Sequence, residues 1–109
     1  MELKYMKNIP GEEVLDLAAL VEVTPGQVVS RTLAQNDHVS ITLFAFDQGE
    51  EISTHASGGD AMVTVLEGTG KFTVDGTPHL VRKGQCLVMP AGKPHAVFAQ
   101  EAFKMLLVV

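Results

Sequence analysis

The chain has 109 residues, enough for one domain with an ordinary hydrophobic core. Its 46% hydrophobic and 19% charged residues are typical of globular proteins, and no apolar run is long enough to cross a membrane. The net charge of -5, with scattered Lys and Arg residues, argues against nucleic acid as a partner, and the single cysteine excludes an internal disulfide. We expect one compact domain over 1–109 and, because the start lacks an apolar leader, cytoplasmic localisation.

The N-terminal stretch fits two kinds of element. Alternating apolar residues over 15–23 are typical of a strand, whereas Val14, Leu17, Ala18 and Val21 also fit the stripe of a helix. The valine-rich ending and the turn at 25–26 favour a strand over about 17–23 that forms a hairpin with 28–34.

Turn-forming residues recur about every 8–12 residues along the chain, which predicts an all-β sandwich or barrel. Between the turns, 39–46, 62–66 and 105–109 are apolar on both faces, so we expect these strands to be covered on both sides. A jelly roll of two antiparallel sheets that pairs with a second subunit would bury this surface. The pattern therefore predicts a homodimer.

The clearest hairpin spans 71–80. Asp75 and Gly76 suit the two positive-φ positions of a type I′ turn, and Phe72 and Val74 alternate with polar neighbours. Pro78 has no backbone N–H to donate, so its strand is predicted to lie at a sheet edge or to begin there.

Two histidines follow short strands in a similar way. An apolar strand after Gly84 runs into a Pro/Gly turn that presents His95, and a short strand after Gly49 presents His55. When two different strands each present a side chain in this way, we expect the two side chains to share one pocket. The segment over 84–95 is the most informative part of the sequence.

These segments resemble the two signature motifs of the cupin family. The first motif (about 49–68 here) expects Gly, His, His, Glu and Gly, and this chain has, in that order, Gly49, His55, Ser57, Ala61 and Gly68. The second (about 84–99) expects Gly, Pro, Gly, His and Asn, and the chain has, in that order, Gly84, Pro90, Gly92, His95 and Ala99.

The resemblance implies a single cupin domain, which is a double-stranded β-helix or jelly-roll barrel. It further implies that His55 and His95 converge inside the barrel mouth, where two neutral imidazoles could hold a divalent metal such as Zn, Ni, Mn, Fe or Cu. Ser57 is a poor ligand and Ala61 is none, so we expect any metal to bind weakly, and a barrel that binds none remains the alternative.

Strand parity and the motif frame together predict a ligand pocket for a small molecule. Its predicted lining is His55, Ser57, Ala61, Val63, His95, Val97, Phe44 and Phe46, with either Met89 or Cys86 depending on which faces inward.

Three other polar residues are expected outside the pocket. Parity directs Asp60 to the opposite face unless the Gly58-Gly59 turn shifts the register by one residue, His79 follows the edge proline, and His38 lies in a turn. Cys86 lies in an apolar strand and is expected to be a buried, inert thiol.

Three functions remain open at this level. The first is a small-molecule-binding cupin with a weak metal centre, which the missing ligands favour. The second is a metal-dependent enzyme of dioxygenase or isomerase type, and the third is an effector-sensing or interaction module.

Overall fold

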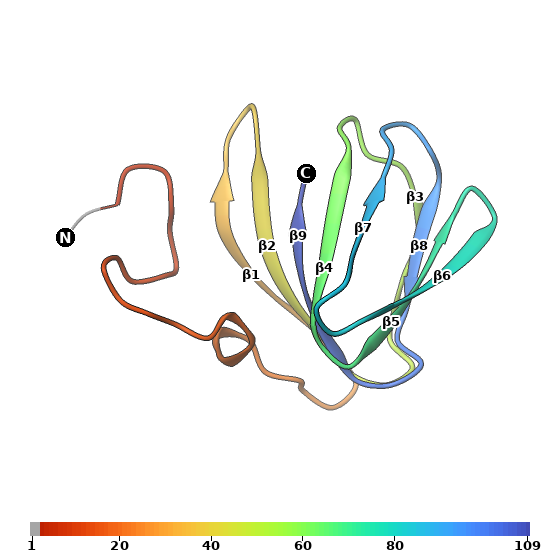
Figure 1. Ribbon diagram of the computed structural model, residues 1–109, viewed down its shortest axis with the longest axis horizontal. Helices are drawn as coiled ribbons and strands as arrows, with labels where there is room; N and C mark the ends of the chain where they lie inside the picture. Colours follow the sequence, from red (N-terminus) through yellow and green to blue (C-terminus); the bar gives the residue numbers. More distant parts are fainter. Residues whose placement is uncertain (1–2) are drawn as a thin grey trace.

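Nine strands form two antiparallel sheets that face each other in this computed structural model, which describes residues 3–109 (Figure 1). The strands are β1 (Val28–Gln35), β2 (Ser40–Phe46), β3 (Glu51–His55), β4 (Ala61–Glu67), β5 (Thr69–Val74), β6 (Thr77–Arg82), β7 (Cys86–Met89), β8 (His95–Phe98) and β9 (Phe103–Val108). One sheet has the order β1-β2-β9-β4-β7 and the other the order β3-β8-β5-β6. The predicted all-β jelly roll is confirmed.

The main core fills the space between the two sheets. Its buried residues are Phe46, Ala61, Val63, Val65, Phe72, Val81, Met89, Val97, Ala99, Phe103 and Met105. Three aromatic rings close one end of the barrel: Phe46 stacks on Phe103 at 4.7 Å between centroids, and Phe72 meets Phe103 edge-on at 6.0 Å. The two histidines lie toward the other end: the inward-facing row of β9 runs from Phe103 to Met105 and Leu107, and the last two line the cavity beside the histidines.

The hairpin of β5 and β6 has the predicted turn and position. Asp75 and Gly76 both have positive φ, at 49° and 83°, as a type I′ turn requires. Strand β6 is an edge strand, so Pro78 costs the sheet no hydrogen bond on its free side.

The expected strand over 17–23 is wrong. Leu17–Leu20 form a short 3-10 helix, η1, and the Asp16 side chain caps it by accepting a hydrogen bond from the Ala18 N–H at 3.3 Å. The alternating pattern does not indicate a strand here, because this segment packs its apolar side chains on the outer face of the five-stranded sheet and does not pair with it. There Val21 forms a second core with Leu43 and Ala45.

This N-terminal segment supplies the cover that the outer face of β2 requires. Polar contacts fix it to the sheet: the Lys7 N–H donates to the Leu33 carbonyl at 2.8 Å, and Lys104 Nζ donates to the Ala18 carbonyl at 2.7 Å. The two-sided apolar character of β2 therefore has an explanation within one chain, and it does not by itself require a second subunit.

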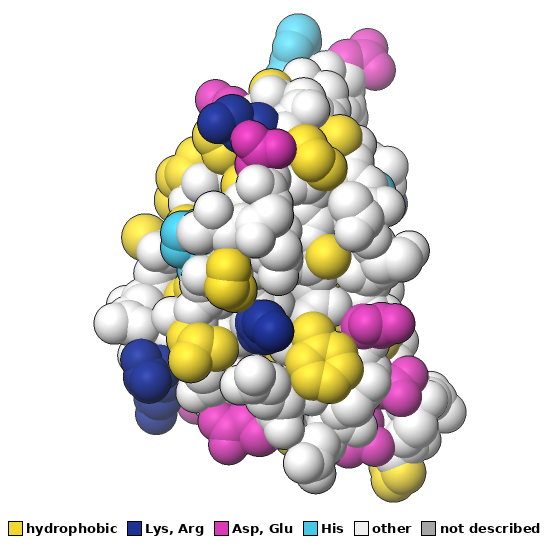
Figure 2. Space-filling model, turned by 90° about the vertical axis from the view of Figure 1, so that its right-hand side faces the viewer, with side chains coloured by type: hydrophobic (Ala, Val, Ile, Leu, Met, Phe, Trp, Pro, Cys, Tyr) yellow, Lys and Arg dark blue, Asp and Glu magenta, His cyan; other side chains and the backbone are white. Residues whose placement is uncertain are grey.

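On the face of the molecule toward β8 and β6, hydrophobic side chains are scattered among polar ones, and Lys and Arg do not gather into a stripe (Figure 2). Within residues 3–109, no helix has the length and apolar character needed to cross a membrane.

The close packing at the aromatic end generates a stability prediction. A Cβ at Gly70 would lie 2.7 Å from the Phe103 ring and 2.8 Å from the Phe72 ring, both fully buried. We therefore expect Gly70→Ala to lower the free energy of unfolding by about 1–3 kcal/mol in urea denaturation. Gly58→Ala is the matched control, because nothing lies within 4 Å of its added methyl group. Equal stability of the two variants would contradict this packing.

Candidate functional site

The site is a pair of histidines held on neighbouring strands. His55 ends β3, His95 begins β8, and the two residues are direct cross-strand partners. Their Nε2 atoms lie 3.1 Å apart, and their rings meet edge-on with centroids 4.3 Å apart. The structure therefore brings together the two residues that the sequence proposed as metal ligands.

An irregularity in β3 aims His55 into the barrel. Ile52 pairs with Val97 and His55 pairs with His95, so β3 uses three steps where β8 uses two. This bulge shifts the alternation of side chains, and Ile52 and His55 consequently line the same interior face. In a regular strand, residues three apart would point to opposite faces.

Backbone carbonyls orient both rings and favour one tautomer of each. His55 Nδ1 lies 2.9 Å from the Ser53 carbonyl oxygen, and His95 Nδ1 lies 3.2 Å from the Lys93 carbonyl oxygen. Because a carbonyl only accepts, these contacts favour the tautomer with the hydrogen on each Nδ1, which leaves a lone pair on each Nε2. Two lone pairs thus face each other at 3.1 Å, an arrangement that a bound cation or a hydrogen-bond donor would stabilise.

The two rings differ in exposure. The side chain of His95 is buried, with 3% exposed, whereas His55 is exposed at the barrel mouth. Burial lowers the pKa of His95 below its usual value of 6.5, and the nearby His55 lowers it further, against the opposing effect of the Lys93 carbonyl. The lowered pKa favours the neutral form of His95, which is the form that can bind a cation.

A cavity of about 60 Å³ lies beneath the pair. Its lining is Ile52, His55, Ser57, Ala61, Val63, Met89, His95, Val97, Met105, Leu107 and Val109. Six of the eight predicted pocket residues are among them. Phe44 and Phe46 do not line this cavity, because Phe46 stacks at the opposite, aromatic end of the barrel and Phe44 lies beside it at 5.9 Å.

The sequence left the wall residue from β7 open between Met89 and Cys86, and the structure selects Met89. Along β7, Met89 pairs with the inward-facing Ala61, whereas Cys86 pairs with Thr64 on the outer face. The expectation of a buried thiol at Cys86 is therefore wrong, and this cysteine is exposed. Met105 also lines the cavity, and the apolar pattern of 105–109 does not show which face it takes.

Hydrogen bonds between two loops hold the barrel mouth in place. The Ser57 carbonyl accepts from the Gly92 N–H at 3.0 Å, and Asp60 Oδ1 accepts from the Ala91 N–H at 2.9 Å. Asp60 thus has a structural role outside the cavity. The φ of 77° at Gly92 allows the tight turn that precedes His95.

The side chains around the cavity offer enough ligands for a weak metal site but too few for a tight one. Across residues 3–109, no cluster of three or more His, Cys, Asp or Glu side chains is placed to hold a metal ion. His38 and His79 are exposed and away from the cavity, and the Ser57 hydroxyl donates to the Gly59 carbonyl at 2.7 Å. Two imidazoles are therefore the nitrogen ligands that this site offers.

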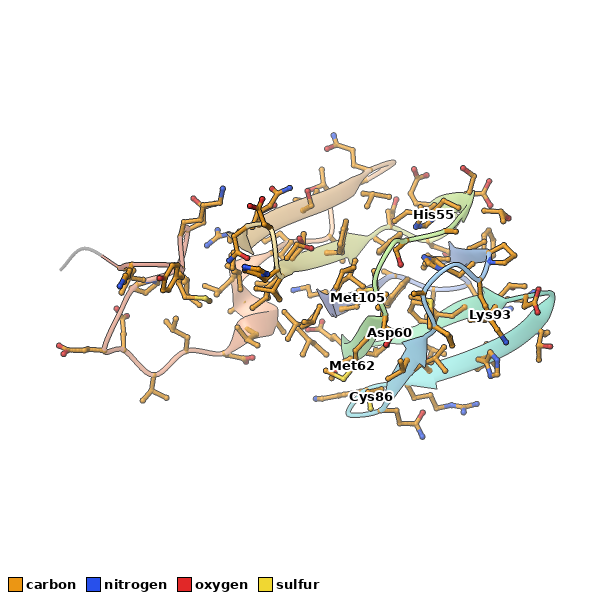
Figure 3. The ribbon with its side chains drawn as sticks, turned by 90° about the horizontal axis from the view of Figure 1, so that it is seen from above. His55, Asp60, Met62, Cys86, Lys93 and Met105 are labelled. Atoms are coloured by element: carbon orange, nitrogen blue, oxygen red, sulfur yellow. The ribbon has the colours of Figure 1, made fainter. Side chains whose placement is uncertain are left out.

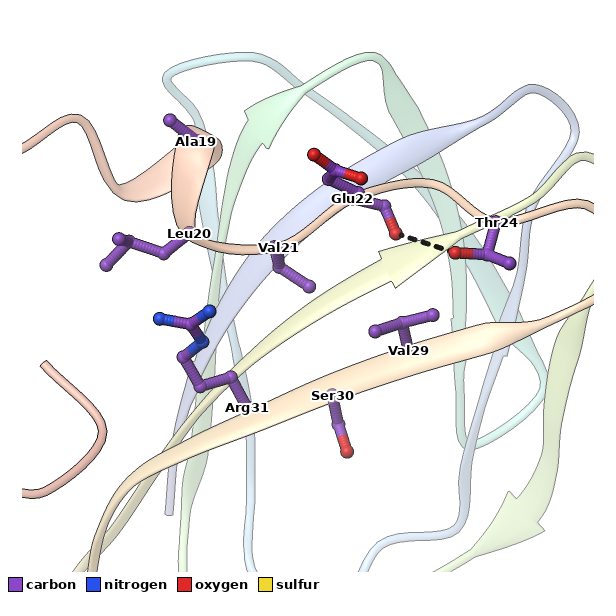
Figure 4. A pocket seen from close by; sticks show the side chains of 8 residues that line it. All are labelled: Ala19, Leu20, Val21, Glu22, Thr24, Val29, Ser30 and Arg31. Atoms are coloured by element: carbon purple, nitrogen blue, oxygen red, sulfur yellow. Dashed lines mark hydrogen bonds between the residues drawn. The ribbon is translucent and has the colours of Figure 1, made fainter.

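A roomier surface hollow of about 380 Å³ lies between residues 19–24 and β1 (Figure 4). Its lining includes Glu22 and Arg31, and the Thr24 hydroxyl donates to the Glu22 carbonyl at 3.4 Å. It holds no histidine or cysteine, and we therefore place the candidate site at the histidine pair.

The fold and site define a class of protein: a small jelly-roll barrel with a histidine pair at its mouth. Residues 42–109 match the model of the Cupin domain family, Cupin_2, and the chain belongs to this family. Members of this family often bind a metal.

Solved structures support the assignment over nearly the whole chain. A conserved protein of unknown function from Streptococcus pyogenes is 50% identical, with a TM-score of 0.96 over 98% of this chain and 94% of that one. A cupin superfamily protein from Desulfitobacterium hafniense is 38% identical, with a TM-score of 0.92 over 97% of both chains.

A more distant relative has a named activity. A dimethylsulfoniopropionate lyase from Ruegeria pomeroyi is 28% identical over 92 residues, which cover 80% of this chain. The chain spans about 60% of the length of that enzyme.

The lowered pKa of His95 generates a prediction on the pH dependence of stability. Its unfolded pKa is about 6.5 and its folded pKa is lower, so the stabilisation by neutral His95 is complete above the unfolded value. It is lost as the pH falls through the folded value. We expect acidification from about pH 7.5 to about pH 5 to lower the free energy of unfolding more in the natural protein than in His95→Asn.

The control for this measurement is His79→Asn, because His79 is exposed and lies outside the cavity. Urea denaturation at each pH should give this variant the pH dependence of the natural protein. Identical pH dependence in His95→Asn and the natural protein would contradict the assignment.

Proposed function

We propose that the protein binds a small ligand or a weakly held divalent metal ion between His55 and His95. One observation carries the proposal: the two Nε2 atoms lie 3.1 Å apart, while both Nδ1 atoms lie within hydrogen-bond distance of backbone carbonyls. The pair is thereby oriented in advance toward one shared cation or donor atom.

The size of the cavity limits what enters it. Sites for drug-sized molecules usually measure about 300–1,000 Å³, far more than the 60 Å³ found here. The space suits an ion with its waters, or the tip of a small organic molecule that extends through the mouth beside His55.

The separation of the two nitrogens supports metal binding. Zinc binds imidazole nitrogen at about 2.0–2.1 Å, so two such ligands in a tetrahedral shell lie about 3.3 Å apart. The observed 3.1 Å needs little adjustment. With two protein ligands, water or the organic ligand must complete the shell, and the affinity is modest. Zn, Ni, Mn, Fe and Cu all accept imidazole ligands.

A metal-dependent enzyme is the second candidate, favoured by the similarity to the dimethylsulfoniopropionate lyase. When bound, the metal would supply Lewis-acid activation of a substrate oxygen. His55 and His95 would hold it, the exposed side of His55 would leave room for substrate, and the apolar walls would exclude water.

Metal titration tests the first candidate. We expect calorimetry with zinc or nickel to detect modest binding by the natural protein and none by His55→Ala or His95→Ala, because one imidazole alone is a poor site. Binding should weaken below about pH 6, because a protonated imidazole cannot bind a metal and a free imidazole titrates at roughly 6.5.

His38→Ala and His79→Ala are the matched controls, since each removes an exposed histidine that lies outside the cavity. Both should bind metal like the natural protein. Undiminished metal binding by His95→Ala with an intact fold would refute the proposed site.

We further propose that the protein is a homodimer that buries the remaining apolar surface of the five-stranded sheet. Met62 is 40% exposed and Val88 53% exposed, and they are cross-strand partners on the outer face of β4 and β7, beyond the N-terminal segment. Burial of such side chains is favourable by roughly 25 cal/mol per Å².

Light scattering at micromolar concentration should give a dimer mass for the natural protein and a smaller mass for Val88→Lys, because the charge would be buried in the interface. Lys71→Ala, on the other sheet, is the control and should remain dimeric. A monomer mass for the natural protein would overturn the proposal.

A further inference from the structure

We propose that the metal preferred by this site is Cu(I), held by His55 and His95 together with the thioether sulfurs of Met89 and Met105. The inference rests on the proposed function, since it assigns an ion to the same histidine pair. It starts from the four residues in the cavity lining that carry a nitrogen or sulfur donor in their side chains.

Met89 stands beside the position of the missing carboxylate. The cupin motif has glutamate where this chain has Ala61, and Met89 is the direct cross-strand partner of Ala61 on the same inward face. Side chains of such partners start about 4.5–5.5 Å apart. The small Ala61 leaves the space open, and the long, unbranched side chain of Met89 can adapt to fill it.

Met105 approaches the cavity from β9. It pairs with Val65 of β4, and it precedes Leu107 in the inward-facing row of that strand. Only 1% of Met105 and 2% of Met89 is exposed. Both thioethers therefore lie in the barrel, where solvent does not compete with them for a bound ion.

The chemistry of this lining favours a soft, singly charged ion. No Asp, Glu, Lys or Arg lines the cavity, so nothing there compensates a second positive charge. Thioethers and imidazoles together suit Cu(I), whereas hard divalent ions prefer carboxylate and water. A singly charged ion also loses less hydration energy than a divalent one on entering an apolar cavity.

The geometry of the imidazoles calls for further ligands. With Nε2 atoms 3.1 Å apart, the two rings bind from adjacent positions and cannot lie on opposite sides of one ion. The other positions of the shell would face the cavity, and Met89 and Met105 are among the residues that line it. In Figure 3, Met62 and Cys86 lie at the far side of the barrel from His55, so neither can take part.

Competition for Cu(I) with the chelator bicinchoninate, under anaerobic conditions, tests the proposal on the full chain. Met89→Leu and Met105→Leu keep side-chain volume and remove sulfur. We expect each to lower Cu(I) affinity by at least about tenfold, because even residues that merely support metal ligands contribute about 10–100-fold. Zinc binding, which uses the imidazoles alone, should stay unchanged.

The matched control is Met62→Leu, which removes an exposed sulfur on the outer face and should bind Cu(I) like the natural protein. Copper X-ray absorption on the natural protein should show both nitrogen and sulfur neighbours, and this measurement does not depend on the folding of any variant.

Three outcomes separate this inference from the proposed function. Loss of Cu(I) binding in His95→Ala, Met89→Leu and Met105→Leu supports both. Loss in His95→Ala alone, or an absorption spectrum without sulfur, overturns the thioether assignment and leaves the histidine site standing. Undiminished Cu(I) and zinc binding in His95→Ala overturns both.

Discussion

The pairing of β3 with β8 determines what this barrel can bind. It places His55 opposite His95, and the bulge after Ile52 turns His55 inward. The carbonyls of Ser53 and Lys93 then accept the Nδ1 hydrogens, so the two Nε2 lone pairs face each other at 3.1 Å. Two lone pairs held this close repel each other, and a cation or a hydrogen-bond donor placed between them would relieve the repulsion.

The remainder of the fold holds the two histidines in this arrangement. Stacked rings at the far end hold the sheets together, and Phe103 contacts both Phe46 and Phe72 there. At the near end, backbone and side-chain hydrogen bonds tie the loop before β4 to the turn before β8. The close-packed core and the hydrogen-bonded mouth together keep the two imidazoles in contact. A more loosely packed structure would let them move apart.

The site also shows how a family frame can keep its geometry while its ligands change. The motif glycines and two of the three motif histidines are kept, but Ser57 and Ala61 replace the third histidine and the glutamate and so remove two donors. The space that results is bordered by sulfur and hydrocarbon. In our proposal this change alters the hardness and charge of the ion that fits. The backbone scaffold stays close to that of the solved cupin structure of Desulfitobacterium hafniense, at a TM-score of 0.92.

The sequence by itself determined the all-β class, the hairpin at Asp75-Gly76 and the candidacy of His55 and His95, because turns and strand alternation are local properties. Tertiary packing decided the rest. The segment over 17–20 forms a 3-10 helix because it covers a sheet. Cys86 faces outward and Met89 inward because of their register with β4. Phe46 fills the aromatic end of the barrel. Register and bulges depend on strands distant in sequence, and no local pattern encodes them.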